Sequence, residues 1–237
     1  MHLGDCLEVG ATADHLITDP PYGFGSYETD KDGGHVVKCL RKFRAPGPGA
    51  SAVFGYPETL VAWCVDLGWR PDEWITWWPT NAAAKAGGRN KGVPRQTEHI
   101  AIFGETVGSR EITQPRSEES RRKPQNAKLS PDVRLGDVWQ DPSPGIAFNA
   151  RLRLHPNEKP VALLLKLVTL VSRPGASILD PFAGSGTTGV AALRLGRRFV
   201  GVERDPTFFA LCCERLRAEE SQTTVAAARS GQKALFG

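Results

Sequence analysis

Apolar positions recur at helical spacing most clearly in the last third of the chain. After Pro160, valines and leucines return every three or four residues as far as Val171, and Arg173-Pro174-Gly175 ends the helix that this pattern predicts. A short apolar run at 177–180 then predicts a buried strand, and a glycine-rich turn leads into a predicted helix over 187–195. We expect another strand over 198–202, a last helix over 206–217 and a disordered tail over 219–237.

The first hundred residues alternate between short β-favouring runs and helical patterns. The predicted strands cover residues 3–6, 15–19, 51–54, 72–78 and 97–103, and the predicted helices cover 36–43 and 57–67. Residues 105–136 differ, because they lack apolar periodicity and mix prolines with many arginines and glutamates. We predict that this stretch is an insertion outside the core.

Composition sets limits and does not by itself indicate a function. The 237 residues are 40% hydrophobic and 24% charged, which is ordinary for one globular domain. No apolar run reaches the ~20 residues of a membrane span, so we expect no membrane partner. The net charge of +4 permits a nucleic-acid partner but does not argue for one.

The cysteines predict neither a metal site nor an oxidising compartment. The five of them form no CxxC pair and have no histidine at a zinc-type spacing. No secretory signal is visible at the N-terminus. We therefore expect a protein of the reducing cytoplasm without a structural metal.

One tetrapeptide, Asp19-Pro20-Pro21-Tyr22, carries unusual chemistry. It follows a predicted strand and offers a carboxylate, a backbone carbonyl fixed by two prolines, and a flat aromatic ring within one turn. These groups suit a planar heterocycle that bears an amino group, such as a nucleobase. For the tetrapeptide alone, an ordinary turn is an equally good interpretation.

A second motif follows the predicted strand at 177–180. Gly184, Gly186 and Gly189 fit the pattern GxGxxG, and Glu203 follows about 20 residues on, as an acid that binds a ribose diol does. Asp180 stands at the mouth of the glycine turn. Its carboxylate would repel the pyrophosphate of a dinucleotide and attract an ammonium or sulfonium group. The motif therefore favours S-adenosylmethionine over NAD as the cofactor.

Together the two motifs resemble those of DNA amino-methyltransferases, and their order resembles the circularly permuted beta group of that family. The cofactor motif is Asp180-Pro181-Phe182-Ala183-Gly184-Ser185-Gly186-Thr187-Thr188, and the catalytic motif is Asp19-Pro20-Pro21-Tyr22. The resemblance spans roughly residues 3–216 apart from the insertion. It implies an α/β fold with a mainly parallel, seven-stranded Rossmann-like sheet, helices on both faces and strands from both chain ends in that sheet.

The resemblance also implies a division of labour along the chain. Residues 1–104 would form the catalytic half of one methyltransferase domain, 137–218 its cofactor-binding half, and 105–136 the target-recognition region. Gly4-Asp5 resembles a turn that touches the adenine of the cofactor, and the segment 155–160 resembles one that opens the helix before the glycine turn. Residues 95–99 resemble the start of a strand near the target-base pocket. The residues implied to bind the cofactor are Asp5, Lys159, Asp180, Pro181, Phe182, Gly184, Ser185, Gly186, Thr187, Thr188 and Glu203.

Basic side chains in two stretches are candidates for contacts with DNA phosphates. One stretch precedes the predicted strand at 97–103, and a solvated basic loop is the alternative for it. The other stretch lies in the insertion. The candidate DNA-binding residues are Lys85, Arg89, Lys91, Arg95, Arg121 and Arg122.

The expected function is transfer of a methyl group from S-adenosylmethionine to N6 of a flipped adenine in double-stranded DNA. Cytosine N4 is the first alternative, although that activity more often has serine at the position of Asp19 in this family. A catalytically inactive DNA-binding relative is disfavoured by the intact Asp19, Tyr22, Asp180 and Glu203. A nicotinamide dehydrogenase would have no use for the Asp19 motif. A homodimer and a cognate restriction enzyme stay open as partners.

Overall fold

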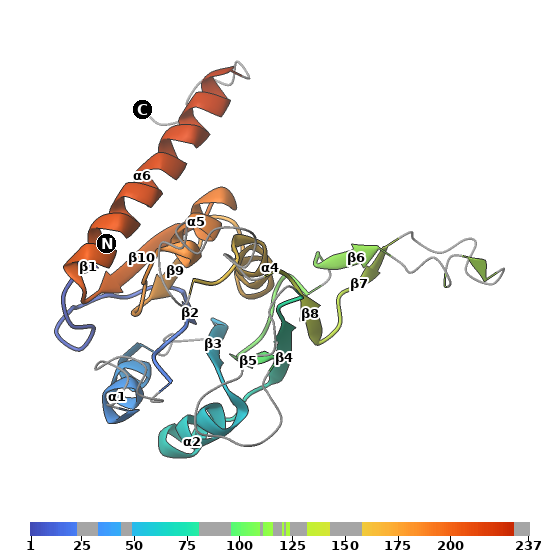
Figure 1. The fold of residues 1–237 in the computed structure, drawn as a ribbon, viewed down its shortest axis with the longest axis horizontal. Coiled ribbons are helices and arrows are strands. Elements are labelled where there is room, and N and C mark those ends of the chain that lie inside the picture. Colours follow the sequence, from blue (N-terminus) through green and yellow to red (C-terminus); the bar gives the residue numbers. More distant parts are fainter. Residues whose placement is uncertain are drawn as a thin grey trace.

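Strands from both ends of the chain lie side by side in one sheet (Figure 1). The computed structural model describes residues 1–22, 33–43, 49–80, 96–109, 111–115, 120, 122–123, 132–142 and 158–229. The eight-stranded sheet has the order β1-β10-β9-β2-β3-β5-β4-β8. Its strands are β1 (His2–Leu3), β2 (His15–Thr18), β3 (Ser51–Gly55), β4 (Glu73–Trp78), β5 (Glu98–Phe103), β8 (Val138–Gln140), β9 (Ser177–Asp180) and β10 (Arg198–Glu203).

The sheet is mainly parallel, as predicted, because only β5 runs against its two neighbours, β3 and β4. The predicted number of seven strands is wrong. The additional strand is β8, which pairs in parallel with β4 at the far edge. It has only three residues, of which Trp139 is buried and Val138 is about half exposed. One alternation in so short a segment is too weak a pattern to predict a strand.

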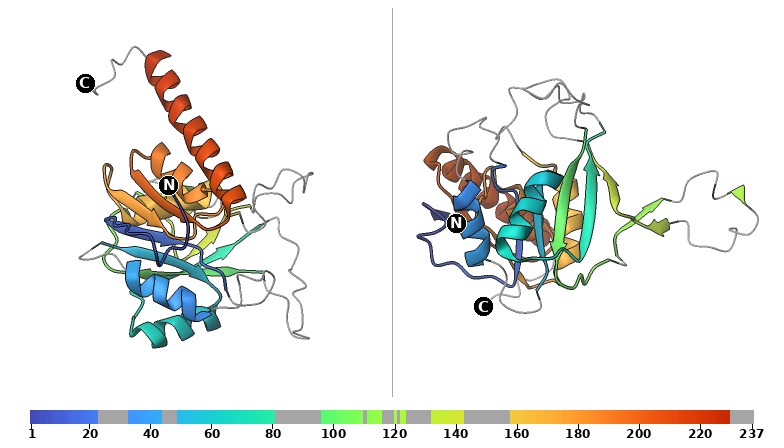
Figure 2. Two further views of the ribbon diagram at one scale, coloured as in Figure 1. Left: turned by 90° about the vertical axis from the view of Figure 1, so that its left-hand side faces the viewer. Right: turned by 90° about the horizontal axis from the view of Figure 1, so that it is seen from below.

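Helices cover both faces of the sheet, as the two views in Figure 2 show. On one face lie α1 (Gly33–Phe43) and α2 (Pro57–Leu67), and on the other lie α4 (Val161–Val171), α5 (Thr187–Arg194) and α6 (Pro206–Arg229). Successive residues of β2 point to opposite faces. Accordingly Leu16 packs with α1 and α2, while Ile17 packs with α4. None of the described helices is both long and apolar enough to cross a membrane.

The insertion over 105–136 is not wholly outside the core. Within it, β6 (Thr113–Pro115) and β7 (Asp132–Arg134) form a separate antiparallel pair, which Figure 1 shows extending beyond β8. At its base, Ile112 is 7% exposed and packs into the cluster around α4. The backbone N–H groups of Val107 and Gly108 both donate to the Leu170 carbonyl at the end of α4. The base of the insertion therefore packs against the core, because the chain passes α4 on its way from β5 to β8.

The last helix is longer than predicted. We expected disorder from residue 219, but α6 continues to Arg229, and residues 230–237 lie outside the described part. The Arg194 guanidinium donates to both Glu219 carboxylate oxygens at 2.8 Å, which ties this part of α6 to α5. No glycine or proline interrupts residues 219–229, so the backbone has no reason to leave the helix near Arg217.

The cysteines also differ from the expectation of reduced thiols. Cys6 and Cys39 form a disulfide, while Cys64, Cys212 and Cys213 are free. The bonded pair is 33 residues apart in sequence. It meets because α1 packs against the loop that follows β1, a contact that cysteine spacing alone does not reveal.

Replacement of Gly108 by alanine should destabilise the protein. A Cβ at this position would lie 1.8 Å from the carbonyl oxygen of Thr169, so backbone must move. We expect the free energy of unfolding to fall by about 1–3 kcal/mol, as in overpacked sites. Urea unfolding followed by circular dichroism measures it. Gly136→Ala is the matched control, because a Cβ there meets no atom within 4 Å. Equal unfolding midpoints for the two variants would contradict the packing of the insertion on α4.

Candidate active site

The two motifs of the sequence lie at the same edge of the sheet. The Asp19 tetrapeptide follows β2 and the glycine turn follows β9, and these strands are adjacent and parallel, with Leu16 opposite Leu179. The hydroxyl of Thr18 donates to Asp180 Oδ1 at 2.8 Å in a buried hydrogen bond. The carboxyl ends of parallel strands are where open α/β sheets bind ligands. The topology therefore joins motifs that are about 160 residues apart into one site.

Asp180 holds the glycine turn together. Its carboxylate is 3% exposed and accepts hydrogen bonds from Thr18, from the Phe182 backbone N–H at 3.1 Å and from the Thr188 hydroxyl at 2.8 Å. Burial raises the pKa of Asp180 to about 6, although these hydrogen bonds favour the charged form. At neutral pH the turn therefore has a buried negative charge at its centre.

Glu203 fastens the other side of the same turn. It ends β10, and its two carboxylate oxygens accept the backbone N–H groups of Gly184 at 2.8 Å and Asp205 at 2.9 Å. Glu203 is half-buried, and each carboxylate oxygen can accept a further hydrogen bond. It thus keeps acceptor capacity toward a diol, and its assignment as a ribose-binding acid stays a prediction.

Two glycines of the motif serve packing within the protein. Gly186 has φ 77°, and a Cβ there would lie 2.4 Å from Cys212 Sγ on α6. A Cβ at Gly189 would lie 2.6 Å from the ring of Phe199 on β10. Glycines in a GxGxxG pattern are usually explained by close approach of the backbone to a ligand. The described contacts instead show that they let α5 approach α6 and β10.

A buried cluster of charges surrounds Asp19. The Lys159 ammonium lies 2.5 Å from Asp19 Oδ2 and 3.0 Å from Glu98 Oε2, and the side chains of Lys159 and Glu98 are each 8% exposed. The Tyr22 hydroxyl donates to Asp19 Oδ1. Lys159 also lies 5.3 Å from the centre of the Phe54 ring. We call Asp19, Tyr22, Glu98 and Lys159 the acid–lysine cluster.

The environment fixes the charges of this cluster. Burial raises the pKa of Asp19, an effect that Lys159 opposes. Burial alone would lower the pKa of Lys159, but the carboxylates of Asp19 and Glu98 raise it above its usual value. Burial and the neighbouring Asp19 raise the pKa of Tyr22 well above 10. Lys159 is therefore an ammonium ion and Tyr22 a neutral hydrogen-bond donor.

Two residues of the acid–lysine cluster, Lys159 and Glu98, differ from what the sequence predicted for them. Lys159 was placed among the cofactor-binding residues, yet its ammonium pairs with the catalytic motif. Glu98 was given no role of its own, although it lies in the segment that resembled a strand near the target-base pocket. A charged residue at the first position of the buried strand β5 was the one available signal.

Most of the remaining residues predicted for the catalytic and cofactor sites lie near the two motifs, while most of the candidate DNA-binding residues lie outside the described part of the chain. Pro20, Pro181, Ser185, Thr187 and Thr188 are buried at the edge of the sheet with both motifs, and Pro21 and Phe182 are half-buried. Asp5 follows β1, beside Glu203 through the Gly4 N–H, which donates to the Glu203 carbonyl. The candidate DNA-binding residues Lys85, Arg89, Lys91, Arg95 and Arg121 lie outside the described residues, and Arg122 is exposed.

Removal of the Lys159 ammonium should destabilise the fold strongly. Lys159→Ala leaves the buried Glu98 carboxylate and the partly buried Asp19 carboxylate without their cation, and breaking a buried pair costs about 3–5 kcal/mol. Glu98→Gln in the same chain should restore part of that loss, because one of the two carboxylates is then gone. Unfolding in guanidinium chloride measures the free energy of unfolding of the single and the double variant. Arg198→Ala, which breaks the exposed contact with Asp14, should stay within about 1 kcal/mol of the unmodified protein. A loss at Lys159 no larger than this control would contradict the electrostatic account.

Comparisons with known proteins show the family of the chain. The N6_N4_Mtase family model, described as DNA methylase, matches residues 13–214. Putative methylase YubD of Escherichia coli (strain K12) is 31% identical over 206 residues, which are 84% of this chain and 82% of that protein. Type II methyltransferase M2.DpnII of Streptococcus pneumoniae is 48% identical over 65 residues, but these are only 27% of this chain and 24% of that protein.

Solved structures show the same fold. The M1.HpyAVI–SAM complex has a TM-score of 0.64 at 22% identity, with 91% of this chain and 97% of that chain covered. The cytosine-N4-specific PvuII DNA methyltransferase has a TM-score of 0.60 at 16% identity, with 93% and 90% covered. At these identities the likeness concerns the fold alone. Because the family model spans most of the chain, the protein belongs to the N6_N4_Mtase family of DNA methylases.

Proposed function

We propose that this protein transfers a methyl group from S-adenosylmethionine to the N6 amino group of an adenine flipped out of duplex DNA. The observation that carries the proposal is the hydrogen bond from Thr18 to Asp180, which fixes the Asp19 motif beside the glycine turn. A target base at one motif and a cofactor at the other would then be neighbours.

The residues of the glycine turn fit this cofactor. Asp180 supplies a buried negative charge that attracts the cationic sulfonium and ammonium groups, and Glu203 has acceptor capacity for the ribose hydroxyls. Bound S-adenosylmethionine supplies an electrophilic methyl group. Because Asp180 is buried and already hydrogen-bonded, we infer that it acts through its charge and through the shape of the turn.

Asp19 and Pro20 would activate the target amino group. The nitrogen lone pair of adenine N6 is delocalised into the ring, so the amino group is a poor nucleophile. When the Asp19 carboxylate and the Pro20 carbonyl each accept one N–H, the nitrogen becomes pyramidal and its lone pair points at the methyl group. As the nitrogen takes up the methyl group, the cofactor would leave as a neutral thioether, and the proton that the nitrogen loses would pass to the Asp19 carboxylate.

Tyr22 and Lys159 have distinct parts in this step. Both Asp19 oxygens are occupied, one by Lys159 and one by the Tyr22 hydroxyl. An entering amino group would replace the Tyr22 hydroxyl on Oδ1. Tyr22 would then be free to stack on the base, a contact worth ~1–3 kcal/mol in other base-binding proteins. Lys159 would stay on Oδ2 and keep the carboxylate in place.

The choice of adenine rests on Asp19, because cytosine-N4 enzymes of this family more often have serine there. The fold does not distinguish the two, since a cytosine-N4 enzyme has a similar structure. Contacts with DNA would come from the basic residues 85, 89, 91, 95, 121 and 122 and from the insertion over 105–136, which we propose as the target-recognition region.

Asp19→Asn should slow methyl transfer strongly without loss of cofactor binding. The substitution removes the negative charge that accepts the amino proton, so the transfer rate should fall by about 10²–10⁴, as for other positioned acid–base groups. Methyl-labelled S-adenosylmethionine and mixed-sequence duplex DNA, digested to nucleosides, measure the rate and the product. The Kd for the cofactor should stay nearly unchanged, and Asp66→Asn, at an exposed position of α2, should change neither quantity.

Two results would contradict the proposal. Label in N4-methylcytosine would overturn the adenine assignment and leave the methyltransferase assignment standing. Cofactor binding without transfer of label to any DNA would favour the inactive DNA-binding relative.

Cofactor affinity should weaken at acidic pH. As the pH falls through about 6, Asp180 takes up a proton and loses the charge that attracts the cofactor. One unit below the pKa only about a tenth of the carboxylate stays ionised, so the Kd should rise up to about tenfold between pH 7 and pH 5. Isothermal titration calorimetry measures this. Asp180→Asn is the control and should bind weakly at every pH. An equal slope in this variant would assign the effect to another group.

A further inference from the structure

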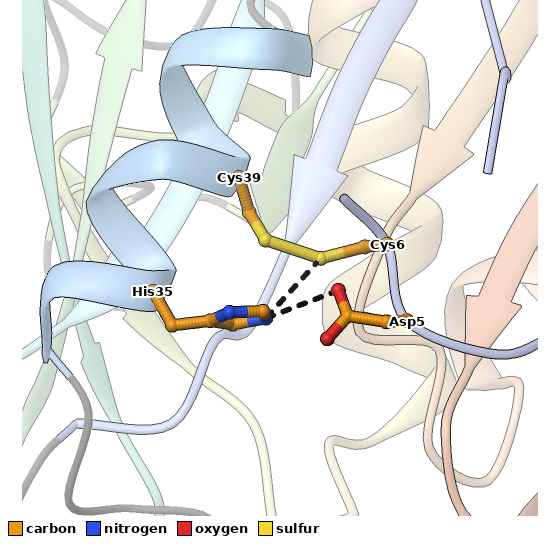
Figure 3. Close-up of side chains that lie close together, drawn as sticks. All are labelled: Asp5, Cys6, His35 and Cys39. Atoms are coloured by element: carbon orange, nitrogen blue, oxygen red, sulfur yellow. Dashed lines mark hydrogen bonds and ion pairs between the residues drawn. A yellow bond between two sulfur atoms is a disulfide. The ribbon is translucent and has the colours of Figure 1, made fainter. Parts of the chain in front are cut away.

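Four potential metal ligands meet between the loop after β1 and the first turns of α1 (Figure 3). Asp5 and Cys6 come from the loop, and His35 and Cys39 come from the helix. One ligand atom from each lies within 4.8 Å of all the others. Cys6 and Cys39 are 4% and 0% exposed, and the side chains of Asp5 and His35 are about a quarter exposed.

We propose that Asp5, Cys6, His35 and Cys39 bind one Zn²⁺ ion when the two cysteines are reduced. Zinc in proteins is tetrahedral, with bonds of about 2.3 Å to sulfur and about 2.0–2.1 Å to nitrogen or oxygen. These bonds place nitrogen and oxygen about 3.3 Å apart, and nitrogen and sulfur about 3.5 Å apart. The structure has 3.3 Å from His35 Nε2 to Asp5 Oδ1 and 3.8 Å from His35 Nε2 to Cys6 Sγ. Two edges of the required tetrahedron are therefore already present.

The arrangement contains more than a disulfide needs. A disulfide requires two cysteines, but here His35 Nε2 also contacts both Cys6 Sγ and Asp5 Oδ1, as the dashed lines in Figure 3 show. His35 and Cys39 are four residues apart on α1, which places them on one face of the helix. Two thiolates and an imidazole are a ligand set that favours zinc over the hard cations Mg²⁺ and Ca²⁺.

The Lys42 ammonium would stabilise the net negative charge of the zinc-bound site. Zn²⁺ with two thiolates and one carboxylate has a net charge of −1. The Lys42 ammonium donates to the carbonyl oxygens of Cys6 at 3.3 Å, Leu7 at 2.6 Å and Val9 at 2.8 Å. It thus holds the same loop onto α1 and places a positive charge beside the ligands.

The disulfide is the oxidised form of this site, and the two forms exclude each other. Reduction by a thiol pair transfers two electrons and two protons to the sulfurs, and the thiol pair becomes a disulfide. Zn²⁺ then binds both sulfurs, and their two protons go to water. In either form the loop is fastened to α1, next to the Gly4 N–H that donates to the Glu203 carbonyl. The site would therefore support the loop beside the proposed cofactor pocket.

Metal binding by the full-length reduced protein tests the proposal. After reduction with a phosphine under nitrogen and removal of metals with a chelator, Zn²⁺ should bind at about one ion per chain, measured by mass spectrometry. Co²⁺ in its place should give the visible bands of tetrahedral coordination and a thiolate-to-cobalt charge-transfer band. Cys39→Ser should abolish that band. His35→Ala and Asp5→Ala should each raise the Kd for zinc at least tenfold, because loss of a ligand weakens binding at least as much as loss of a group that only orients a ligand.

Matched controls separate a zinc site from adventitious binding. Cys213→Ser removes a free, half-buried cysteine of α6 and should leave zinc stoichiometry and the cobalt spectrum unchanged. Circular dichroism of each variant shows whether it is folded. A reduced, folded wild-type chain that binds no Co²⁺ with thiolate character would overturn the proposal. Equal zinc affinity in the wild type and in Cys39→Ser would do so as well, and the cluster would then be a disulfide only.

Discussion

The buried Lys159 ammonium, held between the carboxylates of Asp19 and Glu98, is the interaction on which the site depends. A charge inside a protein is unfavourable unless it is paired with an opposite charge. Here the Lys159 ammonium forms ion pairs with both carboxylates. The three residues come from the end of β2, the start of β5 and the segment before α4. Because none of them can be buried alone, the cluster requires these three segments to converge.

The strand order adds the second constraint. Since β9 lies beside β2, the glycine turn and the Asp19 motif leave the sheet at the same edge, and the Thr18–Asp180 hydrogen bond joins them. Asp180 and Glu203 then shape the turn, while Lys159 holds the Asp19 carboxylate that would face the proposed target base. Cofactor and base would thus be positioned by one rigid edge, which is the requirement for direct transfer between them.

The sequence predicted what is encoded locally. The Asp19 tetrapeptide, the glycine turn and the helix after Pro160 are each recognised from a few consecutive residues, and both motifs lie at one edge of the sheet. The ion pair between Lys159 and Asp19 could not be predicted from the sequence, because the two residues are 140 positions apart. The meeting of Cys6 with His35 and Cys39 likewise depends on how α1 packs. The strand β8 was too short to leave a pattern, and the extension of α6 was missed because a polar tail resembles disorder.

Lys159 would act on methyl transfer through Asp19, and a double-mutant cycle distinguishes this from an independent role of the lysine. Single-turnover rates would be measured with saturating S-adenosylmethionine and DNA for Asp19→Asn, Lys159→Met and the double variant, each first shown to bind the cofactor. The double variant should be no slower than Asp19→Asn alone, because the lysine has no carboxylate left to position. Multiplicative losses from the two substitutions would contradict it, since the lysine would then act independently of Asp19.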